Sequence, residues 1–366
     1  MFQQNNTIVA WYAEDKKTGS YKVWIGSNNE MFGNRDSGYL FRWIGYSDKC
    51  TSPETITNLN LLNVSSVVNM DHLFSHTGYN AMKKLDLGSN FNTKNVINMN
   101  CMFGKTGNNA MTTLNLGSNF DTSNVGTMQW MFAYTGHEAM TGLDLGSKFN
   151  TSKVTDMQNM FRETGYNAMK TLNLGSNFDT SNVTDMSWMF AYTGRNALEK
   201  LDLGTKFNTS NVTKMLYMFF VTGSESMKSL NLGDKFDTSN VTDMNNMFNA
   251  CGFSKMTSLD LGNKFNTSKV TNMKMMFRAT GFTLMNSLNL GDKFDTSNVE
   301  NMEAMFESCG QQSMKTLNLG DKFDTSNVTD MKLMFENCGY TSMTTLNLGS
   351  KFNTAKVTDM GNMFNS

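Results

Sequence analysis

A glycine that recurs at a fixed step of 29 residues constrains the fold of this chain more than any other feature. It follows a Leu-Asx-Leu motif and stands at positions 88, 117, 146, 175, 204, 233, 262, 291, 320 and 349, with no insertion or deletion. A strict period in the range of about 20–50 residues indicates a stacked repeat architecture. Because each repeat contacts only its neighbours, the 366 residues need not divide into globular domains.

One unit shows how the elements are expected to follow one another. Residues 171–174 (Thr-Leu-Asn-Leu) alternate polar and apolar, which predicts a half-buried strand. Phe178 is expected to point inward, and residues 179–182 (Asp-Thr-Ser-Asn) to form a turn. In residues 183–190 the apolar side chains fall at i, i+3, i+6 and i+7, which predicts a short helical turn with one buried face. The expected fold is an α/β solenoid, a leucine-rich-repeat-like stack of 29-residue units with one short strand and one helical turn each.

The first residues do not follow the repeat. Aromatic and β-branched runs at 8–13 and 21–25 flank a turn-rich segment, which predicts a β-hairpin, and residues 39–44 could form a further strand. We expect a β-rich cap in which Trp11, Trp24 and Trp43 pack on the open end of the repeats. The expected division is a cap at 1–55, a degenerate first repeat at 56–84 and strict repeats at 85–366, with the last unit truncated.

Composition excludes several classes of function. With a net charge of −1 and 17% charged residues, the chain has no basic footprint for nucleic acid. No apolar run approaches the roughly 20 residues of a membrane span. The first residues lack the features of a signal peptide, and the last unit has no polar capping repeat. We therefore expect an excised piece of an exported protein, with end-to-end self-association as a possible property of its open end.

The sequence contains no catalytic constellation, so we expect neither enzymatic activity nor a cofactor. His72 and His76 have a spacing that could suit a metal, but no third ligand is evident, and we expect no metal site. The 33 methionines fall mostly in three columns of the repeat, which favours a core filled by flexible thioethers over a metal-binding surface.

The cysteines are few. Cys251, Cys309 and Cys338 share one repeat position, which is threonine in most other units, so we expect a small, half-buried side chain there. Cys309 and Cys338 would lie one turn apart, about 4.8 Å if the strands stack. A disulfide between them is sterically conceivable and is not implied.

Aspartate and asparagine alternate at the third of the four positions of the predicted strand. The column reads Asp86, Asn115, Asp144, Asn173, Asp202, Asn231, Asp260 and Asn289, and a loop column six residues later alternates out of phase with it. Identical carboxylates stacked on neighbouring strands would repel one another. We interpret the alternation as relief of this repulsion, and it suggests a duplication unit of 58 residues.

Two positions of the repeat vary from unit to unit, while the apolar and glycine positions around them stay constant. The position before each Met-Phe pair reads Trp130, Asn159, Trp188 and Tyr217 in four successive units, and the position four residues later includes Tyr134 and Tyr192. On a helical turn these two columns would share one face. Exposed clustered aromatics mark interaction sites. The candidate ligand-binding residues are Trp130, Tyr134, Trp188, Tyr192, Tyr217 and Phe220. The alternative is lateral packing between neighbouring helices, or a contact between copies of the chain.

The frame Leu-Asx-Leu-Gly…Phe-Asp-Thr-Ser-Asn-Val-Thr-Asp-Met-x-x-Met-Phe resembles the BspA-like leucine-rich-repeat surface proteins, which carry the "bacterial surface protein" or DUF285 repeat. The match covers about residues 56–366, and Ala10-Trp11-Tyr12 and Met31-Phe32 are similar to the segment that precedes such repeats. The resemblance implies export, display on a bacterial cell surface and adhesion. It supplies no residue-level binding site.

Two functions remain open at this point. The first is a non-enzymatic recognition or adhesion module that binds a protein or glycan of a host or neighbouring cell. The second is a structural spacer or self-assembling rod without a specific ligand.

Overall fold

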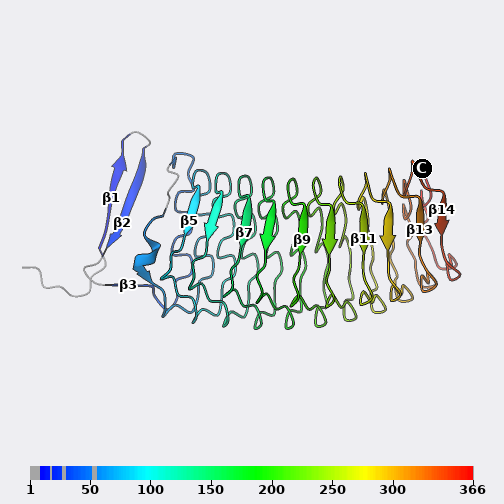
Figure 1. Ribbon diagram of the computed structural model, residues 1–366, viewed down its shortest axis with the longest axis horizontal. Coiled ribbons are helices and arrows are strands. Elements are labelled where there is room, and N and C mark those ends of the chain that lie inside the picture. The colour runs from blue at the N-terminus through cyan, green and yellow to red at the C-terminus, as the bar shows by residue number, and fades with distance from the viewer. Residues whose placement is uncertain (1–8, 17–18, 27–29, 52–55, 366) are drawn as a thin grey trace, which may run out of the picture.

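The computed structural model, which describes residues 9–16, 19–26, 30–51 and 56–365, is a β-solenoid of about 11 parallel stacked turns (Figure 1). Each turn from residue 84 onward contributes one short strand to the same side of the stack. The strands are β1 (Val9–Asp15), β2 (Ser20–Gly26), β3 (Met31–Phe32), β4 (Leu62–Asn63), β5 (Lys84–Asp86), β6 (Thr113–Asn115), β7 (Gly142–Asp144), β8 (Thr171–Asn173), β9 (Lys200–Asp202), β10 (Ser229–Asn231), β11 (Ser258–Asp260), β12 (Ser287–Asn289), β13 (Thr316–Asn318) and β14 (Thr345–Asn347).

Two parallel ladders run along the stack. The first joins the strands in pairs, β5 with β6, β7 with β8, and so on to β13 with β14, always at an offset of one repeat, as in Leu143 opposite Leu172. The second joins every turn through single-residue bridges that run from Asp36 to Asp359. Each repeat is therefore bonded to the repeat before it and the repeat after it.

The predicted helical turn is wrong. Among the described residues the sole helix is one 3₁₀ turn at Leu59–Leu61. In the segment expected to be helical, the amides of Met186, Trp188 and Phe190 donate to carbonyls of the next turn at 3.1, 3.0 and 2.9 Å. The intervening amide of Met189 donates three residues back, to Met186 O at 3.2 Å. The segment is a series of tight turns that also forms part of the ladder, so the fold is a β-solenoid and not an α/β leucine-rich repeat.

Backbone conformation explains why the segment does not become a helix. Trp188 (φ 61°) and Tyr192 (φ 59°) are left-handed, a conformation that a right-handed helix excludes. The same two positions have positive φ in every turn from His72 to Asn337. Apolar residues at i, i+3, i+6 and i+7 fit one face of a helix, but they fit consecutive three-residue turns equally well. The short pattern could not separate the two.

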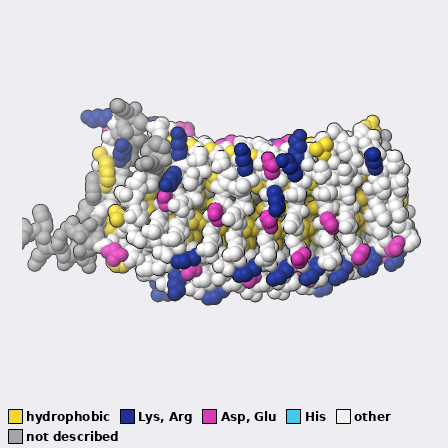
Figure 2. Space-filling view, viewed as in Figure 1, with side chains coloured by type: hydrophobic (Ala, Val, Ile, Leu, Met, Phe, Trp, Pro, Cys, Tyr) yellow, Lys and Arg dark blue, Asp and Glu magenta, His cyan; other side chains and the backbone are white. Residues whose placement is uncertain are grey.

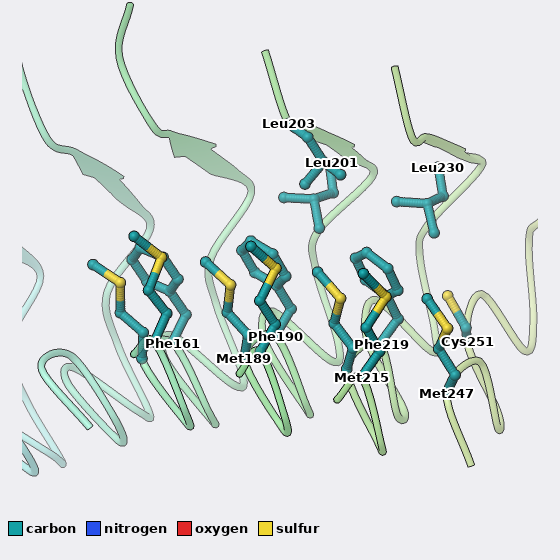
Figure 3. Close-up of a cluster of buried hydrophobic side chains, with 14 of the residues drawn as sticks. Phe161, Met189, Phe190, Leu201, Leu203, Met215, Phe219, Leu230, Met247 and Cys251 are labelled. Carbon is teal, nitrogen blue, oxygen red and sulfur yellow. The ribbon is translucent and has the colours of Figure 1, made fainter. Parts of the chain in front are cut away.

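The core consists of columns of identical side chains, as the repeat predicted. Phe161, Phe190 and Phe219 stack at centroid distances of 5.5 and 5.7 Å with nearly parallel rings (Figure 3). Methionines lie beside the rings, and leucines from the strands close the core on the opposite side (Figure 3). These side chains are almost wholly inaccessible to solvent. The methionine columns therefore fill the core.

The strand Asx residues hold the turn that follows them. Asp144 Oδ1 accepts the amide of Gly146 at 2.9 Å, and Asn173 Oδ1 accepts that of Gly175 at 3.0 Å. Across the pair, Asn173 Nδ2 donates to Asp144 Oδ1 at 3.2 Å. The pairs β5–β6 and β11–β12 have the same Asn-to-Asp bond. The alternation of Asp and Asn thus places a donor amide beside a carboxylate in these three strand pairs, whereas β13–β14 has asparagine on both strands, and the 58-residue unit spans one pair.

The threonine and cysteine column is fully buried, not half-buried as expected. Thr193 Oγ1 donates to Phe161 O of the preceding turn at 2.7 Å, and the equivalent threonines make the same bond. Cys251, Cys309 and Cys338 lie at the equivalent position as free thiols. Burial raises the pKa of the Cys251 and Cys338 thiols to about 12, so both are protonated at neutral pH.

The N-terminal region differs in part from expectation. β1 and β2 pair as an antiparallel hairpin that stands apart from the stack (Figure 1), with Tyr12 and Val23 largely exposed. Residues 39–44 form turns and not the further strand that was expected. Tyr39 and Trp43 occupy the left-handed positions of a coil and stack on the next turn. The solenoid therefore begins before the repeat at 56–84, and this earlier coil covers its first turn.

Of the three tryptophans expected in the cap, Trp43 packs on the solenoid, with its ring 4.1 Å from that of His76. Trp24 lies on the hairpin and is half exposed. The side chain of Trp11 lies outside the described residues.

Candidate functional site

The two variable columns lie at the two left-handed positions of each turn, where the backbone turns sharply. They do not share a helical face, because the helix is absent. All six predicted residues are half-buried, with their rings packed along the stack. The structure places them in two groups separated by the turn of Asn159. Trp130 and Tyr134 lie on one turn, and Trp188, Tyr192, Tyr217 and Phe220 lie together on two later turns.

The second group is a compact aromatic cluster. The rings of Trp188 and Tyr217 are parallel at 4.0 Å. Phe220 meets Trp188, Tyr192 and Tyr217 edge-on, at 5.9, 5.1 and 5.2 Å. Stacked and edge-to-face pairs at these distances stabilise one another beyond the area they bury. Lateral packing between turns therefore occurs, and much of the aromatic surface is used by it.

An arginine joins the two groups. The Arg162 guanidinium carbon lies 5.6 Å from the ring centre of Trp130 and 4.7 Å from that of Trp188, both within cation–π range of about 6 Å. It also lies 5.8 Å from the ring centre of Tyr134. Asn159, which occupies the column between the two tryptophans, is too short to fill the space, so the guanidinium from the same turn fills it. We call Trp130, Tyr134, Arg162, Trp188, Tyr192, Tyr217 and Phe220 the aromatic face.

A charged cluster lies beside the aromatic face. His137 Nδ1 lies 2.6 Å from Glu138 Oε1, and His137 Nε2 lies 3.5 Å from Glu163 Oε2. The imidazole also stacks on Tyr166, at 4.6 Å between centroids. Burial would lower the pKa of His137, but hydrogen bonds with the two glutamates and their charges outweigh it, and the pKa is raised. Burial opposes ionisation of Glu163, whereas hydrogen bonds from His137 and Tyr134 favour it and lower its pKa.

Unpaired polar atoms gather at the same place. Among the described residues, four buried side-chain nitrogen or oxygen atoms lack a hydrogen-bond partner, and three of them belong to Asn159, Arg162 and Ser187. Asn159 is 6% exposed and Ser187 is 5% exposed. The two residues are direct neighbours, because Asn159 N donates to Ser187 O at 3.0 Å. Buried polar groups are almost always paired, so this concentration requires an explanation.

The sequence argument missed Arg162, Asn159, Glu163 and His137. A signal was present in the column three residues after the first left-handed position. It reads alanine in the units of Trp130 and Trp188 but arginine in the unit of Asn159 between them. In these three units a large side chain at the first position is thus followed by a small one three residues later, and a small side chain at the first position is followed by a large one.

A second group of aromatic rings with an arginine lies at the start of the stack, where the Arg42 guanidinium carbon is 5.2 Å from the ring centres of both Tyr39 and Trp43 and Arg42 Nε is the fourth buried atom without a hydrogen-bond partner. On the face in Figure 2, lysines and arginines mix with acidic side chains along the lower edge of the stack, so no field of one sign forms there. In the described ranges, no group of three or more His, Cys, Asp or Glu is placed to hold a metal. His72 and His76 do not converge, because each stacks on an aromatic ring of the preceding coil. Over the same ranges, no helix is long and apolar enough to cross a membrane.

Fold and face together define a class of protein, a parallel β-solenoid of 29-residue coils with a constant core and a variable aromatic surface. The chain also matches the family described as "Mycoplasma protein of unknown function, DUF285" over residues 47–164, 134–251, 194–317, 220–345 and 311–366. Since these matches span most of the sequence, the chain belongs to the DUF285 family. No curated protein matches it, and no solved structure does either.

Proposed function

We propose that this chain is a non-enzymatic recognition module of a bacterial cell-surface protein, and that it binds a protein or glycan of a host or neighbouring cell through the aromatic face. Export, surface display and adhesion are part of the proposal. The resemblance to BspA-like surface proteins favours them.

The observation that carries the proposal is the contrast between the core of the repeats, which is constant, and the aromatic face, which is not. Every turn repeats the core, and Ala304 fills in another turn the position of Trp130 and Trp188, so the fold itself does not require tryptophan there. Aromatic residues and arginine are also the side chains that contribute most at binding hot spots. The face combines both with a charged cluster at its edge.

The test is an array of glycans and extracellular-matrix proteins probed with wild type and a Trp188→Ala/Tyr192→Ala double variant. We expect at least one ligand to bind wild type and to be lost by the double variant. The matched control is Phe253→Ala/Phe282→Ala, which removes another stacked pair, 4.5 Å between centroids, from later turns. A ligand retained by the double variant, or lost equally by both, would contradict the proposal.

The alternative is a structural spacer that stacks end to end. A hollow of about 330 Å³ at the last turns is lined by Phe335, Tyr340, Met343, Leu346 and Phe364 among others, and Phe364 is about half exposed. A second copy of the chain could cover this surface. Light scattering over a concentration series tests the alternative, which predicts a mass that rises with concentration. A monomer at every concentration excludes it.

A further inference from the structure

We propose that the slot between the indole rings of Trp130 and Trp188 binds one pyranose ring of a glycan, and that Arg162 occupies this slot in the free protein. The inference rests on the proposed recognition function and names the ligand class of the same face.

The slot has defined walls. Trp130 and Trp188 stand in one column two turns apart, about 9.6 Å at the usual strand spacing. The outer face of Trp188 is covered by Tyr217 at 4.0 Å, so its free face is the one turned toward Trp130. Arg162 lies between the two rings, and its side chain is 25% exposed, which places it at the mouth of the slot.

The width favours a puckered ring over a flat one. Carbon atoms in contact lie about 3.5–4.0 Å apart, so a flat aromatic ring between two indoles needs roughly 7 Å. The slot is wider than this, and the guanidinium accordingly sits at 4.7 and 5.6 Å from the ring centres, without tight contact to either. The chair of a pyranose is thicker than a flat ring and presents apolar C–H faces on both sides.

The polar atoms at the slot match a sugar and not an apolar side chain. Asn159 Oδ1 can only accept a hydrogen bond, Arg162 Nε can only donate one, and Ser187 Oγ can do either. All three are buried and without a hydrogen-bond partner, although Arg162 Nε has the Glu163 carboxylate 3.5 Å away. Sugar hydroxyls both donate and accept, so one ring could pair with such a mixed set. An apolar group in the slot would leave Asn159 Oδ1 and Ser187 Oγ unpaired, and buried polar groups without a partner oppose binding.

Arg162 can leave the slot without losing its charge partner. Its Nε lies 3.5 Å from Glu163 Oε1, and Glu163 follows directly in the chain. Burial opposes ionisation of Glu163, but hydrogen bonds from His137 and Tyr134 outweigh it and lower its pKa, so the carboxylate remains charged at neutral pH. In the bound state the arginine lies over the sugar and stays paired.

The experiment follows the indole Nε1–H signals by NMR while glucose, galactose, N-acetylglucosamine and glucuronic acid are added separately. We expect at least one sugar to shift the signals of Trp130 and Trp188 in a saturable way and to leave that of Trp43 unchanged. A response to glucuronic acid alone would identify an acidic sugar; a response to the others would identify a neutral one. If no sugar shifts either signal, the inference is wrong.

A variant that fills the slot gives a second readout. Asn159→Leu is expected to weaken sugar binding about tenfold or more, a loss of about 1.4 kcal/mol. Leucine is tolerated at this left-handed position, since Leu333 occupies it at φ 59°. Asn246→Leu is the control, because Asn246 stands in the same column and is equally buried. Unchanged binding by Asn159→Leu would overturn the inference.

The two proposals can fail separately. If the Trp188→Ala/Tyr192→Ala variant loses a protein ligand while no sugar perturbs the indoles, recognition by the aromatic face stands and the sugar slot does not. If the double variant keeps every array ligand, the recognition function itself is wrong.

Discussion

At the scale of single residues, a buried threonine hydroxyl bonds the preceding turn in most repeats, whereas Cys251, Cys309 and Cys338 occupy this position in three of them. Thr193 is inaccessible, and its Oγ1 donates to Phe161 O at 2.7 Å, while the same carbonyl also accepts the amide of Thr164 at 3.0 Å. The threonine bond is therefore a second bond to an already paired acceptor, and removing it should have a moderate effect.

We expect Thr193→Val to lower the free energy of unfolding by about 1 kcal/mol, since it removes one hydrogen bond and keeps the volume. Thr213→Val is the control. Its hydroxyl, which is exposed, bonds Thr184 O at 3.2 Å, and we expect a change within about 0.5 kcal/mol. Urea denaturation measures both. Equal effects would show that burial does not matter at this bond.

Two histidines should act on stability in opposite directions with pH. Burial lowers the pKa of His76 to about 4, and the charges of Lys105 and Arg42 add to this effect. The pKa of His137 is raised by its two glutamates in spite of its burial. Protonation below about pH 6.5, the ordinary histidine pKa, therefore opposes folding at His76 and favours it at His137.

The His137→Gln variant should lose stability relative to wild type mainly at acid pH. The contribution of His137 is fully present below about pH 6.5 and is lost as the pH rises through its raised folded pKa. His76→Gln should instead gain on wild type as the pH falls from about 6.5 toward 4. Denaturation curves at several pH values measure both differences. Parallel curves for the two variants would contradict the assignment.

At the scale of the elements, the strand pair is the structural unit, and its two glycines have different surroundings. Gly146 and Gly175 are both left-handed, at φ 77° and 78°. A Cβ on Gly146 would meet nothing within 4 Å, whereas one on Gly175 would lie 2.6 Å from Gly146 O. Gly262 and Gly291 repeat this difference, with 2.4 Å at the second of the pair.

We expect Gly146→Ala to cost about 1–2 kcal/mol of stability, the cost of a left-handed residue with a Cβ. Gly175→Ala should cost a further 1–3 kcal/mol or so, because the new methyl group meets a backbone oxygen that cannot move alone. Since φ is nearly the same at Gly146 and Gly175, the difference in urea midpoint between the two variants measures the effect of the steric clash alone. Equal losses would show that the strand pairs relax freely.

The repeat period was enough to predict the stack and the inward side chains, because each depends only on which residues fall in register. The alternation of Asp and Asn was interpreted as relief of charge repulsion, and the hydrogen bond from Asn to Asp was not predicted. The helical turn and the strand at residues 39–44 were wrong for a different reason. Both depend on the sign of φ at residues such as Tyr39, Trp43 and Trp188, and these side chains do not reveal a left-handed backbone. The candidate site was predicted in part, since its aromatic rings vary visibly, whereas Arg162 gains its role only from a gap left by Asn159 on the same turn.

At the scale of the whole molecule, stability should depend on intact strand pairs and not simply on length. Deleting residues 175–203 joins Leu174 to Gly204 and removes β9 alone, which leaves β10 without its partner. Deleting residues 175–232 joins Leu174 to Gly233 and removes the β9–β10 pair as a whole. The register of the remaining turns is the same in both variants.

We expect the longer deletion to fold with every remaining strand still paired. In the shorter deletion, amides at residues 229–231 should exchange with solvent faster than in wild type, because their ladder partner is missing. Hydrogen exchange measured by mass spectrometry compares the two. Equal protection at these amides would mean that any two neighbouring strands can pair, and that the 58-residue unit has no structural role.

The Arg162 position also has a consequence for how such a surface can change. Side chains separated by 29 residues in the sequence are neighbours in space, so equivalent side chains repeat at one fixed spacing along the stack. A short residue in one turn leaves a gap between the side chains of the turns on either side. The width of this gap is set by the spacing of the stacked turns. Insertion or loss of a strand pair moves one binding group relative to another by a fixed step of about 9.6 Å. Spacing between contacts, and not only their chemistry, is therefore open to selection in this fold.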